Sequence, residues 1–280
     1  MEIFNMHIGK KAALIISMLF LLTSTSLSQE RDEARGILKK VAETYRNLKS
    51  YYFESNIVVH VKRGQTQVTI DSPIVLAAVR PDKMRMEIKR SPMMLDWVVI
   101  SNGSTTWEFI PTRNEYTKKS GGRTTITATG RDGIERTIDK DEYLRVMAVA
   151  LGVLLPRYDN VMDGLKQARN LREESVDLNG TNIDCYVIEA QYDTPEAFPG
   201  AISSAKSFWI DKKRYVVVRE EYTTKIDSSA MGAQQEHVHT NIFTIVRLDE
   251  LLPETLFTFT PPEGAIEVAD FTSQKKKTEH

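Results

Sequence analysis

Hydrophobic side chains recur at every second position in the stretch from Val79 to Lys118. Met84, Met86 and Ile88 alternate there with charged residues, which is the period of a strand with one face shielded from water. An Asn-Gly pair at 102–103 separates two further runs of this kind, and such a pair favours the positive φ angles of a tight hairpin turn. The pattern predicts an antiparallel meander with its large apolar side chains gathered on one surface. We expect that surface to line an apolar cleft made of Met84, Met86, Ile88, Trp97, Trp107 and Phe109.

The segment before the meander predicts one helix and two long strands. Apolar residues between Arg31 and Leu48 fall on one stripe of a helix, so we expect this helix to cover one face of a sheet. Alternating residues then predict strands over Tyr51–Lys62 and Gln67–Arg80. Pro73 within the second strand indicates a sheet edge or a bulge, because proline cannot donate a hydrogen bond to a neighbouring strand.

The segment after the meander combines a loop with an unusual helix. Gly, Thr and charged residues dominate Ser120–Arg136, which we interpret as a mobile loop. Asp139–Leu155 predicts a helix that is apolar on nearly all sides, and such a helix must be buried all round. We expect it to lie in the concave side of the sheet as a lid, with the lid residues Tyr143, Met147, Leu151 and Leu154. A shorter helix is predicted around Val161–Ala168.

Strands dominate the second half of the chain. A hairpin is predicted around Asn179–Gly180, a second one over Lys206–Ile226, and a long strand over Gln234–Leu248. This set of elements predicts an α+β fold with one strongly curved antiparallel sheet, a covering N-terminal helix and an inserted helical lid. No repeat or linker divides the chain, so we expect residues 29–272 to form a single domain. The charged residues 273–280 are expected to form a disordered tail.

The first 28 residues have the pattern of a secretory signal peptide. Lys10 and Lys11 precede an apolar run over Ala12–Leu22, and small residues follow it up to Ser28, near which we expect cleavage. The apolar run is too short to span a membrane. An uncleaved N-terminal anchor is the alternative.

Composition narrows the classes of partner and chemistry. The chain has 280 residues, and its 37 Lys and Arg balance 38 Asp and Glu, whereas a nucleic-acid-binding protein needs an excess of positive charge. We therefore expect no nucleic-acid partner. The single cysteine, Cys185, permits no internal disulfide, and its strand-like surroundings predict a buried thiol.

Few residues are candidates for catalysis. His237 and His239 share one face of a predicted strand and could bind a metal, but a metal site needs further ligands, so a pair without metal is the favoured interpretation. A metal-dependent hydrolase centred on this pair is an alternative. The chain contains no G-x-S-x-G motif, and the neighbouring acids Glu173–Glu174 and Glu220–Glu221 are expected to point to opposite faces of their strands. We expect neither an enzyme nor a cofactor.

Three motifs resemble the LolA family of periplasmic outer-membrane lipoprotein carriers. They are Arg80-Pro81-Asp82, the hairpin ISNGSTTWEFIPTRNEYTK at 100–118, and the segment FTFTPPEGAIEV at 257–268. The opening ILKKVAETYRNLKSYYFES at 37–55 also resembles the first helix and strand of that family. The resemblance implies an unclosed β-barrel whose concave apolar face, under a helical lid, receives the acyl chains of lipoproteins or other lipids.

The resemblance also implies a location, partners and a latch. The protein would be a soluble periplasmic monomer that takes lipoproteins from an inner-membrane donor to an outer-membrane acceptor. Arg80 would correspond to the arginine that hydrogen-bonds to the lid. Met84 and Met86 stand where the family has aromatic residues, and the insert that contains Ser120–Arg136 is longer than in the family. The resemblance therefore does not identify the lipid or lipoprotein that is carried. The alternative on the same scaffold is an envelope sensor of mislocalised lipoprotein that acts on a membrane regulator.

Overall fold

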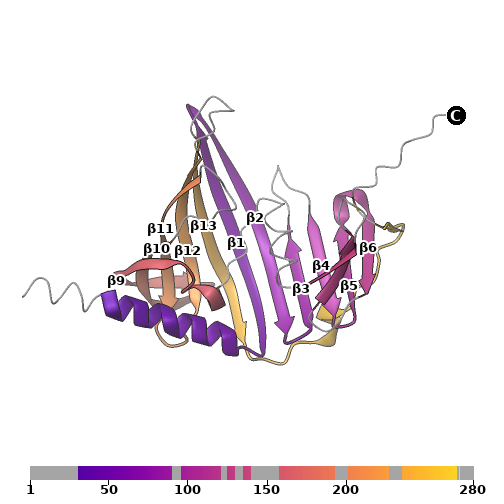
Figure 1. Ribbon diagram of the computed structural model, residues 1–280, viewed down its shortest axis with the longest axis horizontal. Coiled ribbons are helices and arrows are strands. Elements are labelled where there is room, and N and C mark those ends of the chain that lie inside the picture. Colours follow the sequence, from indigo (N-terminus) through magenta and orange to yellow (C-terminus); the bar gives the residue numbers. More distant parts are fainter. Residues whose placement is uncertain are drawn as a thin grey trace, which may run out of the picture.

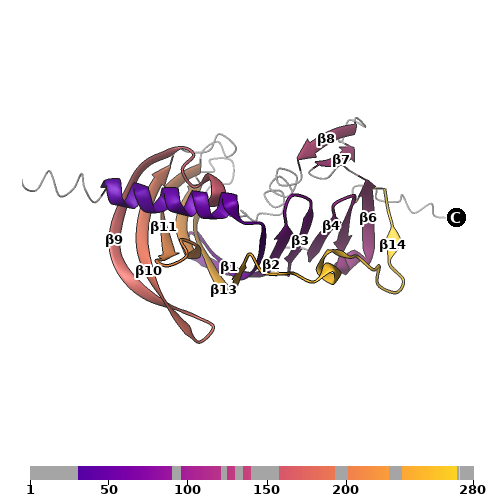
Figure 2. The same cartoon turned by 90° about the horizontal axis from the view of Figure 1, so that it is seen from below.

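One curved sheet dominates the computed structural model, which describes residues 31–89, 96–120, 125–129, 135–139, 158–192, 201–226, 235–269 and 271. Twelve strands join in the order β14-β6-β5-β4-β3-β2-β1-β13-β12-β11-β10-β9. Neighbouring strands are antiparallel, except that β14 pairs with β6 in parallel. The two edge strands, β14 and β9, stay far apart, so the sheet forms an unclosed barrel (Figure 1, Figure 2). The predicted α+β fold with one strongly curved sheet is confirmed.

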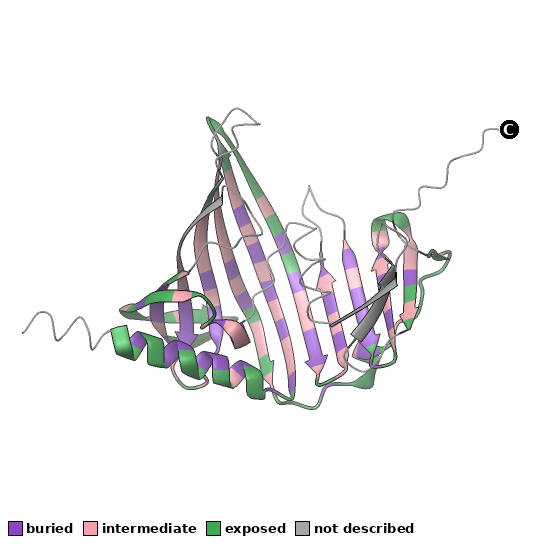
Figure 3. Ribbon diagram, in the orientation of Figure 1, coloured by how far each residue is buried: buried purple, intermediate pink, exposed green. Residues whose placement is uncertain are grey.

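The strand bounds follow the alternation of the sequence. The first half consists of β1 (Ser50–Arg63), β2 (Thr66–Val79), β3 (Lys83–Ile88), β4 (Trp97–Asn102), β5 (Thr105–Ile110) and β6 (Glu115–Ser120). The second half contributes β9 (Leu165–Leu178), β10 (Thr181–Tyr192), β11 (Ala201–Asp211), β12 (Val217–Ile226), β13 (Gln235–Leu248) and the short β14 (Ile266–Glu267). Short 3-10 helices lie at Pro111–Arg113, Tyr158–Asn160 and Glu254–Phe257. Buried and partly exposed positions alternate along the strands, as expected for a sheet with two different faces (Figure 3).

The N-terminal helix, residues 31–47, lies across the concave side of β9 to β13 (Figure 2). Its apolar stripe packs into the largest hydrophobic cluster together with side chains from β1 and from β10 to β13. Leu38 and Val41 from the helix are fully buried in this cluster, whereas Lys39 and Lys40 are exposed. The helix therefore folds where its sequence predicted, because burying the stripe against the sheet stabilises it more than its own hydrogen bonds do.

The chain after β13 crosses the opposite, convex face of the sheet (Figure 2). Leu252 and Phe257 in this segment are buried against Ala77 of β2. Further on, the Phe259 ring lies 5.8 Å from the Phe109 ring, between centroids. The segment then adds β14 to the edge strand β6. The FTFTPP motif thus covers the outside of the meander.

Pro73 lies at the point where β2 loses one neighbour. Pairing between β2 and β3 ends at Ile74 and Ile88, and the Pro73 carbonyl accepts a hydrogen bond from the Lys89 N–H. Beyond this point β1 is the only strand among the described residues that pairs with this part of β2. The local sheet edge predicted from this proline is confirmed, since a residue without an N–H is tolerated where no partner strand needs it.

Two predicted elements are wrong. The segment Ser120–Arg136 was expected to be a loop, yet it contains β7 (Thr125–Thr129) and the start of β8 (Glu135–Asp139), which form a separate hairpin. The β-branched residues of this Thr-rich stretch favour a strand over a loop. The short helix predicted around Val161–Ala168 is instead a turn, ended by Gly164 at φ +67°, followed by the first residues of β9. Pairing with β10 overrides the weak helical pattern there.

Several other predictions fall on residues that the structure does not describe. Among these are the signal peptide, the charged tail and nearly all of the apolar helix over Asp139–Leu155, of which only Asp139 is described, in β8. The lid residues Tyr143, Met147, Leu151 and Leu154 therefore lie outside the described part of the chain.

Candidate functional site

The pairing of the strands decides which side chains share a face of the sheet. Directly paired residues of antiparallel strands lie on the same face. One such row runs across four strands through Phe53, Leu76, Met86 and Val99. Phe53 packs in the cluster under the N-terminal helix, so the whole row lies on the concave face.

A continuous apolar patch occupies this face over the middle of the sheet. We call it the central apolar surface, and its members are Ile57, Val59, Ile74, Met84, Met86, Ile88, Trp97, Val99 and Ile110. All nine are buried, and Met86 is 0% exposed. The apolar neighbours described for this patch come from β1 and β2 and from Phe271. The N-terminal helix packs instead on the other end of the concavity.

The six residues predicted to line a cleft divide between the two faces. Met84, Met86, Ile88 and Trp97 lie together in the central apolar surface. Trp107 and Phe109 do not belong to it, because Glu108 pairs with Val99 and so takes the concave position in β5. Both aromatic rings point to the convex face and contact Phe259. The prediction of one common surface is therefore wrong for Trp107 and Phe109.

Arg80, the predicted latch, contacts the N-terminal helix. Its Nη1 donates a hydrogen bond of 2.8 Å to the Arg46 carbonyl, and its backbone N–H donates to the Lys49 carbonyl. The Arg46 carbonyl belongs to the last turn of the helix, where backbone acceptors have no partner within the helix. Arg80 therefore caps the helix C-terminus with a positive charge. A contact with the lid would involve residues outside the described part of the chain.

A group of polar side chains interrupts the apolar concave face, and the sequence analysis did not predict this group. Two further rows of paired residues define it, one through Phe208, Glu220, Asn241 and Ile57, the other through Lys206, Tyr222, His239 and Val59. Together with Tyr158 from the 3-10 helix at Tyr158–Asn160, we call the polar members the concave polar cluster. They are Tyr158, Lys206, Glu220, Tyr222, His239 and Asn241.

Glu220 is the centre of this cluster. The side chain is buried, and its two oxygens accept hydrogen bonds from the Lys206 Nζ at 2.9 Å and from the Tyr158 hydroxyl at 3.0 Å. Burial, together with the Glu220 charge, raises the pKa of Tyr158 well above its usual value. The Lys206 ammonium also lies over the Tyr222 ring, 4.5 Å from the centroid. The Lys206–Glu220 ion pair thus leaves the cluster without net charge.

The two histidines considered as metal ligands both lie on the concave face: His239 is a member of this cluster and His237 lies next to it. The His239 ring stacks on Tyr222 with centroids 4.5 Å apart, and the two histidine rings are 6.1 Å apart. Burial, with smaller contributions from His237 and Lys206, lowers the pKa of His239 to about 4, so this ring is neutral near pH 7. No group of three or more His, Cys, Asp or Glu side chains placed to hold a metal occurs within the described ranges.

Glu108 gives the concave face a second buried ion pair, in β5. Its side chain is 1% exposed, and its Oε1 forms an ion pair with Lys119 of β6. Thr117 of the same strand donates a hydrogen bond to this oxygen. The other carboxylate oxygen, Oε2, has no hydrogen-bond partner in the described part of the chain. The central apolar surface therefore lies between two ion pairs of the concave face, Lys206–Glu220 beyond β13 and Lys119–Glu108 on β5 and β6.

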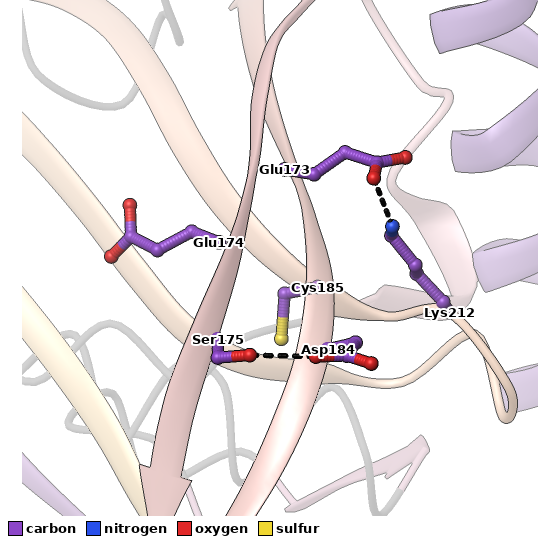
Figure 4. A pocket seen from close by; sticks show the side chains of 6 residues that line it. All are labelled: Glu173, Glu174, Ser175, Asp184, Cys185 and Lys212. Atoms are coloured by element: carbon purple, nitrogen blue, oxygen red, sulfur yellow. Dashed lines mark hydrogen bonds and ion pairs between the residues drawn. The ribbon is translucent and has the colours of Figure 1, made fainter.

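A shallow hollow on β9 and β10 contains the only cysteine (Figure 4). Its volume is about 280 Å³, and the residues lining it are Glu173, Glu174, Ser175, Asp184, Cys185 and Lys212. Burial and nearby acids raise the pKa of Cys185 to about 12, so the thiol stays protonated and is a poor nucleophile. The buried thiol predicted from the sequence is confirmed. Glu173 and Glu174 point away from each other, as predicted for neighbours in a strand (Figure 4).

Comparison with solved structures finds matches at low sequence identity and low TM-score. A LolA superfamily protein from Nitrosomonas europaea is 14% identical, with a TM-score of 0.33, and the match covers 81% of this chain and 97% of that chain. An uncharacterised conserved protein from Thermus thermophilus is 10% identical, with a TM-score of 0.39 and coverage of 84% and 98%. The complex of MucA and MucB from Pseudomonas aeruginosa gives 12% identity and a TM-score of 0.37, with coverage of 81% and 61%. At these values no function transfers from those proteins to this chain.

No helix in the part of the chain that the structure describes is both long and apolar enough to cross a membrane.

Sequence comparison identifies the family of the chain. No curated protein matches the chain. One family model matches residues 34–270, which is most of the chain, and its description is a predicted periplasmic protein. The chain therefore belongs to the DUF2092 family of predicted periplasmic proteins.

Proposed function

We propose that this protein is a periplasmic carrier that binds acyl chains on the central apolar surface. The observation that supports this proposal is the position of that surface: nine large or branched apolar residues lie on the concave face of an unclosed sheet. Apolar contact of this kind suits an acyl chain, because each methylene removed from water contributes about 0.8 kcal/mol. Met84 and Met86 suit a varied cargo, since methionine side chains adapt to the shape of a ligand.

The proposal also includes export of the protein, a helical lid over the binding surface and the transfer of cargo between membranes. Residues 1–28 would direct export and be cleaved near Ser28. The apolar segment Asp139–Leu155 would cover the central apolar surface until a lipid displaces it, with Arg80 helping to hold the closed state. The cargo would be lipoprotein acyl chains or related lipids, taken from an inner-membrane donor and delivered towards an outer-membrane acceptor. The role is binding and transfer, with no catalytic step.

A matched pair of variants on β4 tests the binding surface. Val99 lies in the central apolar surface, and its neighbour Val98 points to the opposite face. Val99→Thr puts a hydroxyl against the bound chain with almost no change of volume, so we expect it to weaken binding of a fluorescent fatty-acyl probe about fivefold or more. Val98→Thr is the control and should bind like the unmodified protein. Both are purified from the periplasm and compared by titration.

Two results would contradict the carrier proposal. Equal affinity of the two variants would remove the central apolar surface as the binding site. Failure of the unmodified protein to bind the probe, together with a stable complex with a membrane regulator from the same cells, would favour the envelope sensor. Mass spectrometry of lipids that co-purify with the protein identifies the cargo class.

A further inference from the structure

The concave polar cluster adjoins the central apolar surface directly. Asn241 pairs with Ile57 and His239 pairs with Val59, so polar residues of β13 lie beside apolar residues of β1 in the same two rows. On the other side of the cluster, Phe208 and Ala190 belong to the apolar cluster under the N-terminal helix. A molecule lying along the concave face from β3 to β12 would thus meet apolar side chains first and polar side chains next.

Asn241 is the member of this cluster with unused hydrogen-bonding groups. Its side chain is 6% exposed, and with the residues that the structure describes neither Oδ1 nor Nδ2 makes a hydrogen bond of ordinary geometry. One amide N–H of Asn241 forms a weak hydrogen bond with the Tyr158 hydroxyl, which lowers the pKa of that hydroxyl, and the hydroxyl itself donates to Glu220. The second amide N–H and Oδ1 are left for a ligand. A buried polar group left without a hydrogen bond costs about 1–3 kcal/mol. This amide is therefore placed to gain from a ligand that offers both a donor and an acceptor.

We propose that the concave polar cluster, through Asn241, recognises an uncharged amide group at the head of an acyl chain that lies on the central apolar surface. This proposal rests on the proposed function and adds the chemical class of the ligand. The Asn241 Nδ2 would donate to the ligand carbonyl, and Oδ1 would accept from the ligand N–H. An amide offers that complementary pair of groups, whereas a ketone or an ester offers only an acceptor.

The charges around Asn241 favour an uncharged head group over an anionic one. The ammonium of Lys206 is already paired with Glu220 at 2.9 Å, so it does not leave a free positive charge for a phosphate or carboxylate. His239 adds none near neutral pH, because burial lowers its pKa to about 4. A buried anion without a counter-charge would be strongly disfavoured.

Competition binding with two ligands of equal length tests the inference. The ligands are N-methyldodecanamide and the ketone in which a CH2 group replaces the amide N–H, and each displaces a fluorescent fatty-acyl probe. The measured quantity is the preference, the Kd of the ketone divided by the Kd of the amide. For Asn241→Leu we expect the preference to fall about fivefold or more, because the amide N–H then loses the Oδ1 acceptor, a hydrogen bond that the ketone cannot make in either protein. Probe affinity itself should change little.

Asn56→Leu is the matched control. Asn56 also has an unpaired Oδ1, and it neighbours Ile57 in β1, so its side chain points to the convex face. This variant should keep the preference of the unmodified protein. Asn241→Thr serves as a second variant in case leucine disturbs the fold, and thermal unfolding verifies that all variants are folded.

The outcomes separate the two proposals. If the unmodified protein binds the probe but Asn241→Leu and Asn241→Thr keep its preference, the inference about Asn241 is wrong and the carrier proposal stands. If dodecyl phosphate competes more strongly than the amide, the assignment of an uncharged head group is wrong. If neither ligand nor probe binds the unmodified protein, both proposals are wrong.

Discussion

His239 shows how a single residue on the concave face makes stability depend on pH. Burial lowers the pKa of His239 to about 4, and the ordinary value in an unfolded chain is about 6.5. Between these two values the unfolded chain binds more protons than the folded protein, so this residue makes folding less favourable as the pH falls from about 6.5 to 4. Above about 6.5 its effect is constant, since the ring is neutral in both states.

Replacing His239 with Gln tests this pH dependence. The unmodified protein should lose more stability than His239→Gln when urea unfolding is measured at pH 7 and again at pH 5. His60, which hydrogen-bonds to Thr69 at 2.9 Å nearer the tip of β1, provides the control as His60→Gln. Equal losses in the unmodified protein and His239→Gln would show that His239 is not buried as a neutral ring.

Residue patterns in the sequence predicted some of these positions and not others. Alternation in β3 put Met84, Met86 and Ile88 on one face, and the structure agrees. Alternation cannot decide which face the next strand presents, because that depends on the register across the turn, and this is why Trp107 and Phe109 were misplaced. The concave polar cluster was not predictable, because its members come from three strands and a 3-10 helix that only the folded chain brings together.

At the scale of single elements, the N-terminal helix depends on its cap as well as on its apolar stripe. The guanidinium of Arg80 donates to the Arg46 carbonyl in the last helical turn. A cation there is favourable because it faces the negative end of the helix dipole, an effect of about 0.3–1 kcal/mol at exposed sites. The same residue is the proposed latch, so one substitution probes both roles.

Arg80→Met removes the charge and the hydrogen bond while keeping much of the side-chain length. We expect the free energy of unfolding to fall by about 1 kcal/mol or less. If the latch proposal is also correct, the acyl probe should exchange faster than from the unmodified protein. Lys39→Met, on the exposed face of the same helix, should change neither quantity. Unchanged stability and exchange in Arg80→Met would contradict both roles.

Elements with a strong period were predicted well, and weakly patterned ones were not. The helix over residues 31–47 and the long strands have one clear apolar face, which tertiary packing can only use in one way. The segments that became β7 and the start of β9 have mixed composition, so strand pairing decided their structure. Local sequence has little influence where the neighbouring strand supplies the hydrogen bonds.

At the scale of the whole molecule, the unclosed sheet has a convex face and a concave face, and different segments of the chain pack on each. The C-terminal segment packs on the convex face over β2 to β6 (Figure 2). On the concave face, the N-terminal helix covers β9 to β13, and the central apolar surface lies beyond it. The two faces therefore differ in what covers them.

Photolabelling with a fatty-acyl chain that carries a diazirine at its end tests this account most directly. After irradiation, mass spectrometry of the digested protein identifies the residues that contacted the chain. We expect saturable labelling of Met84, Met86, Ile88 or Trp97, with competition by unlabelled lipid. Labelling concentrated instead on the convex Trp107 and Phe109, or labelling that does not saturate, would contradict the assignment of the concave face as the lipid-binding surface.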